Sequence, residues 1–344
     1  MIPRRAVVLF NLGGPDSLGA VRPFLFNLFS DPDIFKLPFG AIGQALFAAA
    51  VSFLRAPQAR KGYAAIGGRS PLLANTEAQA HALAAAFATA KEGRMQAAGG
   101  GAAPVAPAVE PPPDVFICMR YWHPRARDTI ARLKSGGYDQ VVLLPLYPQY
   151  SATTTGSSYN EFMHEAQRQG YAPDVKPIRE WYDEPEYQQA IVQTLREEAG
   201  HFPDPDPERI EVLFSAHGLP QKFVDAGDPY EQHVRATYEA LRRRLGWPRT
   251  TLCYQSRVGP LKWLGPYTDA VIRQKAAAGA DQILVYPIAF VSDHVETLYE
   301  LGMLYRDVAR RAGVAHYRVA PALNTHPLLI EALRKLVDRA LTHA

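Results

Sequence analysis

The sequence predicts an α/β protein made of two similar doubly wound lobes, each a parallel sheet flanked by helices. Short runs rich in leucine and β-branched residues alternate with helical stretches, and these runs cover 6–12, 114–119, 140–146, 210–216 and 282–288. Such runs are typical of parallel strands that are buried on both faces. The length of 344 residues exceeds the usual size of one hydrophobic core, which favours two lobes.

Helical periodicity fills the segments between these runs. The predicted helices cover 75–90, 125–135, 185–200, 230–245, 266–278 and 326–342. Residues 97–113 are almost entirely Gly, Ala and Pro, and we interpret them as part of a flexible insertion at 91–113. The first lobe is therefore assigned to 1–148 together with the C-terminal helix 326–344, and the second lobe to 149–325.

Two segments of the first half have counterparts in the second half, which indicates a duplicated unit. Residues 11–15 (NLGGP) end one predicted strand, and residues 216–220 (AHGLP) end another. Residues 137–145 (GYDQVVLLP) resemble residues 279–287 (GADQILVYP) in the same way. The two predicted sheets are therefore expected to be equivalent.

The same alignment places a titratable pair in the second half alone. His217 falls opposite Leu12, and Glu296 falls opposite Thr154. Ligands of open α/β sheets bind beyond the carboxyl ends of the strands, and both His217 and Glu296 lie just past such ends. We therefore expect these two side chains to face one cleft.

His217 lies where an apolar strand breaks at Gly218 and Pro220. A neutral imidazole at such a position can accept a proton or ligate iron. The alternative is a structural histidine that bonds to the backbone at the strand end. Ser215 does not indicate a hydrolase, because no Gly-x-Ser-x-Gly elbow surrounds it.

Glu296 also has a structural and a chemical interpretation. Asp293 and Glu296 have the spacing of a capping box, which would make them a helix start and nothing more. Four potential ligands nevertheless lie within two helical turns: Asp293, His294, Glu296 and Glu300. Glu296 and Glu300 share one helical face, and such a face suits a divalent ion that is bound loosely enough to be passed on.

Composition and short motifs exclude several classes of protein. Lys plus Arg exceed Asp plus Glu by only three, 37 against 34, and no basic run is long enough to follow a phosphate backbone, so nucleic acid is not an expected partner. Residues 11–15 lack the glycine spacing of a dinucleotide loop. The N-terminal apolar run is too short for a signal peptide, so we expect a cytoplasmic protein. Cys118 and Cys253 lie in strand-like runs, and two cysteines cannot supply the four thiolates of an iron–sulfur cluster.

Residues 18–54 are rich in leucine and phenylalanine, including Phe24, Phe26, Phe29, Phe35, Phe39 and Phe47. The run 41–54 is too short to span a bilayer, so it is either a buried helix or an apolar lid over an apolar substrate. A lid could also touch a membrane, with three basic residues at the lipid headgroups: Arg55, Arg60 and Lys61. Three polar residues that follow the lid could hold carboxylates: Arg55, Tyr63 and Ser70.

At these residues the chain resembles the ferrochelatase family over nearly its whole length. The shared blocks are NLGGP at 11–15, YxxIGGxSP at 63–71, MRY at 119–121, YPQYS at 147–151, FSAH at 214–217, QSRVGP at 255–260, WLGP at 263–266 and PIAFxSDH at 287–294. Each block alone is weak, whereas all of them in this order are highly specific.

The resemblance implies two Rossmann-like lobes of the class II chelatase type with a porphyrin cleft between them. It also implies insertion of Fe2+ into protoporphyrin IX to give protohaem with release of two protons, the last step of haem biosynthesis. His217 would accept pyrrole protons or help to seat the iron, Glu296 would act on the opposite side in proton or metal transfer, and His294 would support both. The propionates would be anchored by Arg55, Tyr63 and Ser70, and the macrocycle would be lined by Leu12, Arg120, Tyr121, Trp263 and Phe290.

The resemblance further implies that iron is a substrate and that no cofactor is permanently bound. Many members extend the acidic line one turn beyond Glu300, but this sequence has Leu304 there, which argues against a long carboxylate path for iron. Members with an iron–sulfur cluster carry cysteines after the last helix, and this sequence ends at Ala344 with none. Ala152 occupies another position where a cysteine occurs in some members, so no cluster is expected.

Other functions stay open at this point. A coproporphyrin ferrochelatase, or a chelatase that loads cobalt or nickel into a more carboxylated tetrapyrrole, would share the architecture. The apolar segment 18–54 argues against the more polar substrates. A haem or metal carrier would use His217 as a ligand without turnover, and a nucleotide-dependent oxidoreductase would need the missing glycine spacing. A peripheral contact with the inner membrane is also an expectation, and the sequence does not determine the oligomeric state.

Overall fold

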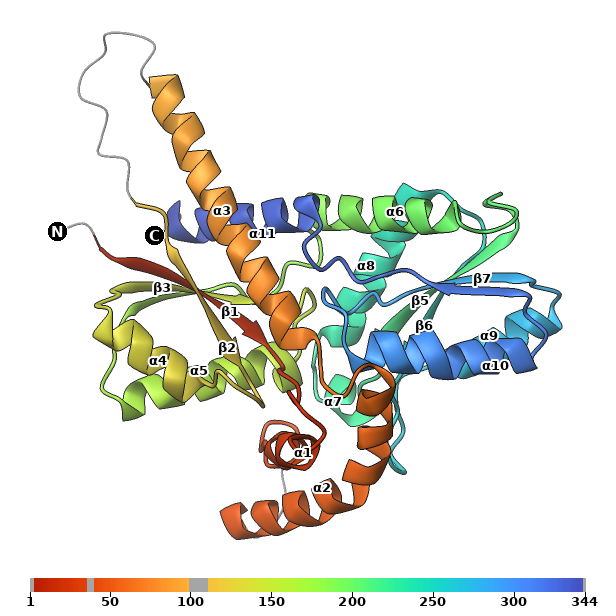
Figure 1. The fold of residues 1–344 in the computed structure, drawn as a ribbon, viewed down its shortest axis with the longest axis horizontal. Coiled ribbons are helices and arrows are strands. Elements are labelled where there is room, and N and C mark those ends of the chain that lie inside the picture. The colour runs from red at the N-terminus through yellow and green to blue at the C-terminus, as the bar shows by residue number, and fades with distance from the viewer. Residues whose placement is uncertain (1–2, 36–39, 99–110, 343–344) are drawn as a thin grey trace.

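The computed structural model describes residues 3–35, 40–98 and 111–342, which form two four-stranded sheets with parallel strands (Figure 1). The first sheet has the order β2-β1-β3-β4, with β1 at Arg5–Asn11, β2 at Asp114–Met119, β3 at Gln140–Pro145 and β4 at Asp174–Pro177. The second has the order β6-β5-β7-β8, with β5 at Ile210–His217, β6 at Thr250–Gln255, β7 at Gln282–Tyr286 and β8 at His316–Val319. The predicted α/β class with two similar lobes is confirmed.

The two sheets share one register as well as one strand order. Arg5 pairs with Gln140 in the first sheet, and Ile210 pairs with Gln282 in the second. The two pairs correspond under the two predicted alignments, which set Leu12 opposite His217 and residues 137–145 opposite 279–287. The duplication is therefore present in the backbone, down to the pairing of individual residues.

Alternation along the strands divides the apolar side chains between separate layers. Val7 and Leu9 of β1 point into a middle layer, whereas Ala6 and Val8 point to the opposite face. The middle layer contains α3 (Leu72–Ala98), α6 (Pro185–Ala199), α8 (Tyr230–Leu245) and α11 (Pro327–Thr342). The outer faces carry α4 (Ala126–Ser135) and α5 (Ser157–Arg168) on the first sheet, and α9 (Thr268–Ala277) and α10 (Arg306–Arg311) on the second. Phe214 of the second sheet also enters the middle layer, so one apolar core joins the lobes.

Two helices of this middle layer are exchanged between the lobes, and they lie end to end in Figure 1. α6 follows β4 of the first sheet but packs on α8 of the second lobe. α11 follows β8 of the second sheet but packs on α3, β3 and β4 of the first lobe, to which residues 326–344 were assigned. The lobe boundary predicted at 148 falls too early, because β4 pairs with β3 and belongs to the first sheet.

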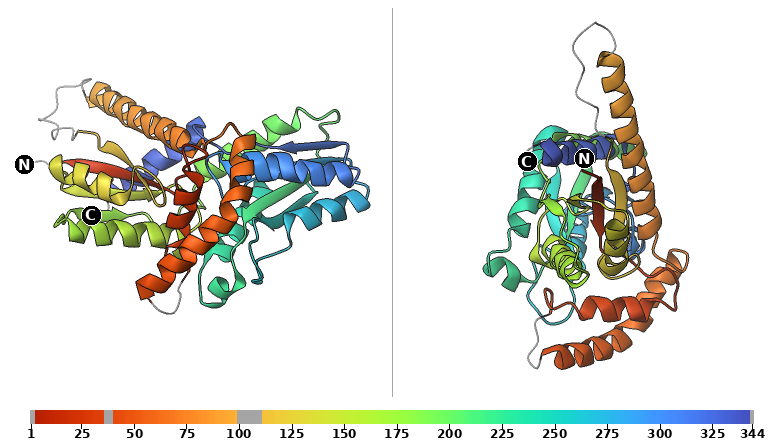
Figure 2. Two further views of the ribbon diagram at one scale, coloured as in Figure 1. Left: turned by 60° about the horizontal axis from the view of Figure 1, so that its bottom comes forward. Right: turned by 90° about the vertical axis from the view of Figure 1, so that its left-hand side faces the viewer.

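The predicted insertion begins later than expected. α3 continues as a helix to Ala98 and projects beyond the rest of the molecule (Figure 2). The remaining core of that prediction, residues 99–110, lies outside the described residues. Most of the predicted strands and helices otherwise agree with the observed elements to within a few residues. β6 contains the strand-like run around Cys253, whereas β4 and β8 were not predicted.

The segment 18–54 forms two helices rather than one lid. α1 (Val21–Phe29) and α2 (Gly40–Ala65) pack against each other beside the first sheet (Figure 2). Pro57 lies inside α2, where it removes one helical hydrogen bond and crowds the preceding turn, and α2 is bent along its length (Figure 1). Within the described residues, no helix combines the length and the apolar character needed to cross a membrane.

The segment has one buried and one exposed apolar face. Phe24 and Phe29 are buried in an apolar cluster with Tyr63. The opposite face of α2 leaves large apolar side chains in solvent: Ile42, Leu46, Phe53 and Leu54, with exposed fractions of 76%, 68%, 63% and 73%. Phe39 lies outside the described residues.

Candidate functional site

The structure brings His217 and Glu296 together at the carboxyl ends of the second sheet. His217 is the last residue of β5, and Glu296 is the first residue of a π-helix, η2 (Glu296–Tyr305), that follows β7. The distance from His217 Nδ1 to Glu296 Oε2 is 2.7 Å. The two side chains are thus in direct contact, and the pair stays partly open to solvent.

The pair is electrostatically coupled. Burial alone would lower the pKa of His217, but the adjacent Glu296 carboxylate outweighs it, and the pKa of His217 is raised. Burial would raise the pKa of Glu296, but the charge and hydrogen bond of His217 outweigh it and lower the pKa to about 2. The two side chains therefore favour the form in which imidazolium and carboxylate share one proton.

Ser256 connects Glu296 to a second carboxyl group. Its Oγ lies 3.0 Å from Glu296 Oε2 and 2.5 Å from Glu300 Oε2, and its backbone N–H donates to Glu300 Oε1 at 2.9 Å. The hydroxyl of Tyr305 donates to the same Glu300 oxygen at 2.8 Å. Burial and the charge of Glu296 raise the pKa of Glu300. A continuous line of hydrogen bonds thus runs from His217 outward to Tyr305.

Sequence reasoning did not identify Ser256 as part of the site. The residue has φ of 65°, a left-handed conformation that is uncommon for a serine. This conformation directs its N–H and hydroxyl toward η2. The shared block QSRVGP contains the residue, but no spacing or charge in it indicates a partner forty residues further along the chain.

The capping-box interpretation of Asp293 and Glu296 is wrong. Asp293 accepts hydrogen bonds from Asn324 Nδ2 at 2.8 Å and from Thr297 Oγ1 at 2.9 Å, while Glu296 turns toward His217 and Ser256. The backbone N–H of Asp293 is bonded to Asn324 Oδ1. Glu296 is therefore free of any capping role, and Glu296 and Glu300 do share one face, as expected.

His294 lies behind the pair in a buried position. Its Nδ1 is 3.1 Å from the carbonyl oxygen of Ser292, and its ring packs edge-on against Phe290, with 4.4 Å between ring centroids. Burial lowers its pKa. His294 Nε2 is buried without a hydrogen-bond partner among the described residues. A neutral, fixed imidazole in this place can shape the site without competing for the first proton.

Apolar side chains from both lobes surround this line. Leu12, Tyr63 and Val295 belong to one apolar cluster, and burial, followed by the charge of Glu296, raises the pKa of Tyr63. Gly62 of α2 lies against Tyr299 of η2, because a Cβ at this position would come within 2.9 Å of the Tyr299 ring. The end of α2 is therefore packed directly on the helix that carries Glu296.

Trp263 and Phe290 lie on the second-lobe side. The His217 and Phe290 rings are 6.1 Å apart between centroids. Trp263 is half-buried, and its Nε1 donates to the carbonyl of Val258 at 3.0 Å. A Cβ at Gly218 would lie 3.2 Å from the Trp263 ring and 2.8 Å from the Gln255 carbonyl, so only glycine permits this close approach next to His217.

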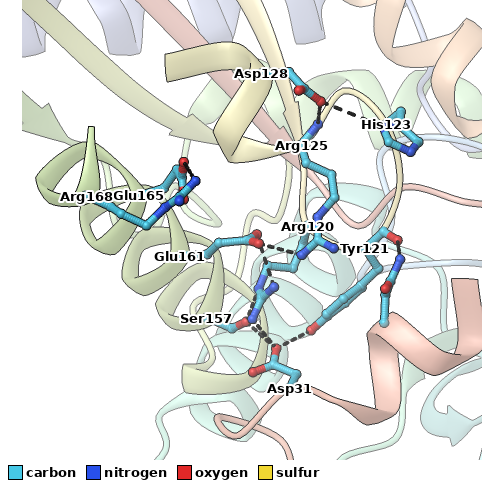
Figure 3. Close-up of polar contacts among 11 residues, drawn as sticks. Asp31, Arg120, Tyr121, His123, Arg125, Asp128, Ser157, Glu161, Glu165 and Arg168 are labelled. Atoms are coloured by element: carbon cyan, nitrogen blue, oxygen red, sulfur yellow. Dashed lines mark hydrogen bonds and ion pairs between the residues drawn. The ribbon is translucent and has the colours of Figure 1, made fainter. Parts of the chain in front are cut away.

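Arg120 and Tyr121 occupy a different environment from the expected one (Figure 3). Tyr121 has no exposed surface, and its hydroxyl donates to Asp31 Oδ2 at 2.6 Å. Arg120 forms ion pairs with Asp31 at 3.0 Å and with Glu161 at 3.1 Å, and its Nε donates to Ser157 Oγ. In this conformation the Tyr121 ring is covered and cannot line a macrocycle directly in the way that the resemblance implied. Asp31 was not identified by sequence reasoning.

The three residues predicted to hold the propionates lie in different environments. Arg55 is exposed on α2, and Ser70 packs against Gly14, where a Cβ would lie 2.4 Å from its Oγ. Ser70 Oγ also accepts a hydrogen bond from Leu72 N at 3.3 Å, at the start of α3. Tyr63, in contrast, is buried in the apolar cluster next to Val295.

The donors that meet at the site are few. Among the described residues, no three or more His, Cys, Asp or Glu side chains cluster as a metal site. Separately, an open cavity of about 430 Å³ lies between residues 32–34 and the short helix α7 (Gln221–Asp225), lined there by Lys222 and Phe223. His217 and Glu296 are not part of its lining, so this cavity is separate from the pair.

Residues 4–341 match the family model described as Ferrochelatase. The ferrochelatase of a Synechococcus species is 45% identical over 97% of this chain and 93% of its own length, and that of a Synechocystis species is 44% identical over 98% and 83%. Among solved structures, SirB from Bacillus subtilis with Fe3+ is similar with a TM-score of 0.51 at 11% identity, covering 98% of this chain and 95% of that one. The sirohydrochlorin chelatase SirB from Bacillus subtilis subspecies spizizenii, in complex with cobalt, gives the same TM-score over 99% and 96%, which shows the shared chelatase fold.

Proposed function

The chain belongs to the ferrochelatase family and is a metal chelatase of the lyase class, and on that premise we propose that it inserts Fe2+ into protoporphyrin IX with His217 and Glu296 at the reacting centre. The observation that carries this proposal is the 2.7 Å contact between His217 Nδ1 and Glu296 Oε2 at the carboxyl ends of β5 and β7. Insertion of a divalent metal requires a base for two pyrrole protons and a place where the metal meets few strong ligands. One imidazole and one carboxylate, with no thiolate beside them, meet both needs.

The proton steps follow from the hydrogen bonds. His217 accepts a pyrrole proton in its neutral form, which is present as the pH rises through its raised pKa, and Glu296 stabilises the imidazolium that forms. Ser256 carries a single hydroxyl proton, so it can donate to Glu296 only while a protonated Glu300 donates to Ser256 in turn. The raised pKa of Glu300 favours this protonated form. Outward transfer needs the reverse arrangement: after Glu300 has released its proton to solvent, a protonated Glu296 donates to Ser256 while Ser256 donates to the ionised Glu300, to which Tyr305 stays a donor.

This line is better suited to protons than to iron. Beyond Glu300 the next turn of η2 presents Leu304, which is 42% exposed and offers no ligand atom. A hydroxyl relay passes a proton by exchanging hydrogen bonds, whereas an iron ion would need a ligand at each step. We propose that iron reaches His217 and Glu296 by another route.

Distortion of the porphyrin ring is the remaining requirement of the reaction, and the apolar side chains around the site would supply it. A flat porphyrin keeps its lone pairs in the ring plane, so contacts that pucker the ring expose a nitrogen to base and metal. Leu12, Tyr63, Trp263 and Phe290 are proposed to contact the ring, and these side chains are held by packing from both lobes. Their apolar surface favours protoporphyrin over coproporphyrin, which carries two more carboxylates.

No resident cofactor is proposed. Cys118 in β2 and Cys253 in β6 lie in different sheets, and burial raises the pKa of both thiols, the latter to about 12. Iron and acid-labile sulfide in the purified protein should both be below about 0.1 per chain, and a stoichiometric cluster would contradict this part of the proposal.

The function is tested by anaerobic insertion of Fe2+ into protoporphyrin IX and, in parallel, into coproporphyrin, followed by absorbance. His217→Ala and Glu296→Gln should lose turnover by about a hundredfold or more while porphyrin quenching of fluorescence is retained. Two exposed residues give matched controls, His201→Ala and Glu208→Gln, which should match the parent. A parent that binds porphyrin but never metallates it would refute the proposal and favour a carrier; faster turnover of coproporphyrin would refute the substrate assignment.

We also propose that the exposed face of α2 binds a membrane surface. Ile42, Leu46 and Phe53 lie on one helical face, and the Arg22 guanidinium lies 5.4 Å from the Phe53 ring centroid. Apolar side chains beside basic ones suit a bilayer interface with anionic lipid. The protein should sediment with vesicles of phosphatidylglycerol and phosphatidylcholine, and Phe53→Ser should weaken this binding about tenfold. Met163→Ser, at an exposed site on α5, is the control, and equal binding of the Phe53 variant would contradict the proposal.

A further inference from the structure

One carboxylate of the second lobe holds helix starts in both lobes. Asp228, in the loop between α7 and α8, accepts hydrogen bonds through Oδ2 from Ser151 Oγ at 2.9 Å and from Ala152 N at 2.8 Å. Ser151 and Ala152 begin a short π-helix, η1 (Ala152–Gly156), that continues directly into α5 of the first lobe. Through Oδ1 the same carboxylate accepts from the backbone N–H of Tyr230, the first residue of α8, at 3.0 Å.

The internal duplication identifies the residues of the second lobe that correspond to Ser151 and Ala152. With Asp139 aligned on Asp281, Ser151 corresponds to Asp293 and Ala152 corresponds to His294. The first-lobe copy of the site therefore carries no titratable side chain at these positions. It instead receives Asp228 from the lobe that carries His217, so the first-lobe counterpart of the site is an attachment point between the lobes.

Asp228 is also connected to the catalytic imidazole. Tyr230 is buried, and its hydroxyl donates to the backbone carbonyl of His217 at 2.9 Å. The N–H of this same tyrosine is held by Asp228. A short path of hydrogen bonds thus runs from the start of η1 through Asp228 and Tyr230 to the end of β5.

We propose that Asp228 is a positioning residue that fixes His217 relative to the first lobe, acting through Tyr230. This inference rests on the proposed role of His217 as the base. The ring contacts of the first lobe and the base of the second lobe must keep one spacing if a bound porphyrin is to meet both. A carboxylate has two acceptor oxygens and can hold both helix starts at once, each of which also favours a negative charge.

Asp228→Asn tests this assignment without changing the size of the side chain. An amide offers one acceptor oxygen, so it can hold η1 or α8 but not both. We expect kcat for Fe2+ insertion to fall about tenfold, with the KM for protoporphyrin IX within about twofold of the parent, as for loss of one charge-assisted hydrogen bond. Tyr230→Phe removes only the donor to the His217 carbonyl, and it should lower kcat in the same direction.

The second readout is the NMR titration of His217 in the full chain with labelled histidine, assigned by its absence in His217→Ala. Displacement of His217 lengthens its contact with Glu296, so its pKa should be lower in both variants than in the parent. Asp225→Asn, three residues away on α7, is the control of equal charge change and should leave kcat and the titration unchanged.

A parental kcat and a parental His217 titration in Asp228→Asn would overturn the proposal. If Asp228→Asn does not fold, as judged by its thermal transition, the same two measurements on Tyr230→Phe decide. A shifted His217 titration in a protein whose parent shows no metal insertion would instead refute the proposed function and leave the positioning role intact.

Discussion

Replacing Asp31 by asparagine should destabilise the protein by about 3 kcal/mol. Asp31 is 2% exposed and accepts hydrogen bonds from Tyr121 at 2.6 Å and from Ser157 at 2.5 Å, and it forms an ion pair with Arg120 at 3.0 Å. Removing one partner of a buried ion pair costs about 3–5 kcal/mol, because the other charge stays buried. Arg120 keeps its second pair with Glu161 at 3.1 Å, which places the expected loss at the lower end.

Urea unfolding at 25 °C, followed by circular dichroism, measures this loss. With a slope of about 3 kcal/mol per molar urea, the midpoint should fall by about 1 M. Asp33→Asn is the matched control two residues away, where the carboxylate accepts one exposed hydrogen bond from Asn160 at 3.0 Å, and its effect should stay within about 0.5 kcal/mol. A loss of unfolding free energy below about 1 kcal/mol in Asp31→Asn, or one equal to that of the control, would show that the contacts of Asp31 with Arg120 and Tyr121 do not stabilise the fold to the expected extent.

Three further predictions concern the reacting centre. Glu296→Gln removes the charge that raises the pKa of His217, so the pH at which kcat falls on the acidic side should be lower than in the parent. An unchanged pH for this fall would show that Glu296 does not control the protonation of His217. Ser256→Ala interrupts the hydroxyl line and should lower kcat about tenfold, whereas Ser256→Thr, which keeps a hydroxyl, should recover part of the rate; equal rates for the two variants would exclude the relay. The ion pair stabilises the fold most at mildly acidic pH: the contribution of His217 is full below about pH 6.5 and is lost as pH rises through its raised pKa. The contribution of Glu296 is full above about pH 4.5 and is lost as pH falls toward 2. The difference in urea midpoint between the parent and His217→Ala should therefore be largest near pH 5.5 and smaller near pH 9.

The central strands were predictable because their apolar runs are long and buried. β1, β3, β5 and β7 lie in the middle of their sheets, and each contains an apolar run that stands out in the sequence, although Glu211 and Ser215 interrupt the run of β5. β4 and β8 lie at sheet edges, have four residues each and bury little, so no apolar run identifies them. The lobe boundary was misplaced for the same reason, since β4 was not recognised as a strand of the first sheet.

The pair of His217 and Glu296 could be predicted because the internal duplication locates the ends of equivalent strands. Ser256 and Asp31 could not, because their roles depend on contacts between distant parts of the chain. Ser256 acts through a left-handed backbone, and Asp31 through partners that lie about 90 and 126 residues away. Tyr121 was assigned to the wall by resemblance alone, and only the folded chain shows that its ring is covered.

The exchange of α6 and α11 has a consequence for the order in which the protein can be made. The strands of the first sheet leave the ribosome early, but the helix that covers one of their faces, α11, is synthesised after the entire second lobe. Val142 and Leu144 therefore stay uncovered while more than half of the chain is still being translated. The first lobe cannot finish folding as an early unit, and a chain that stalls before residue 327 presents an apolar face suited to capture by a chaperone.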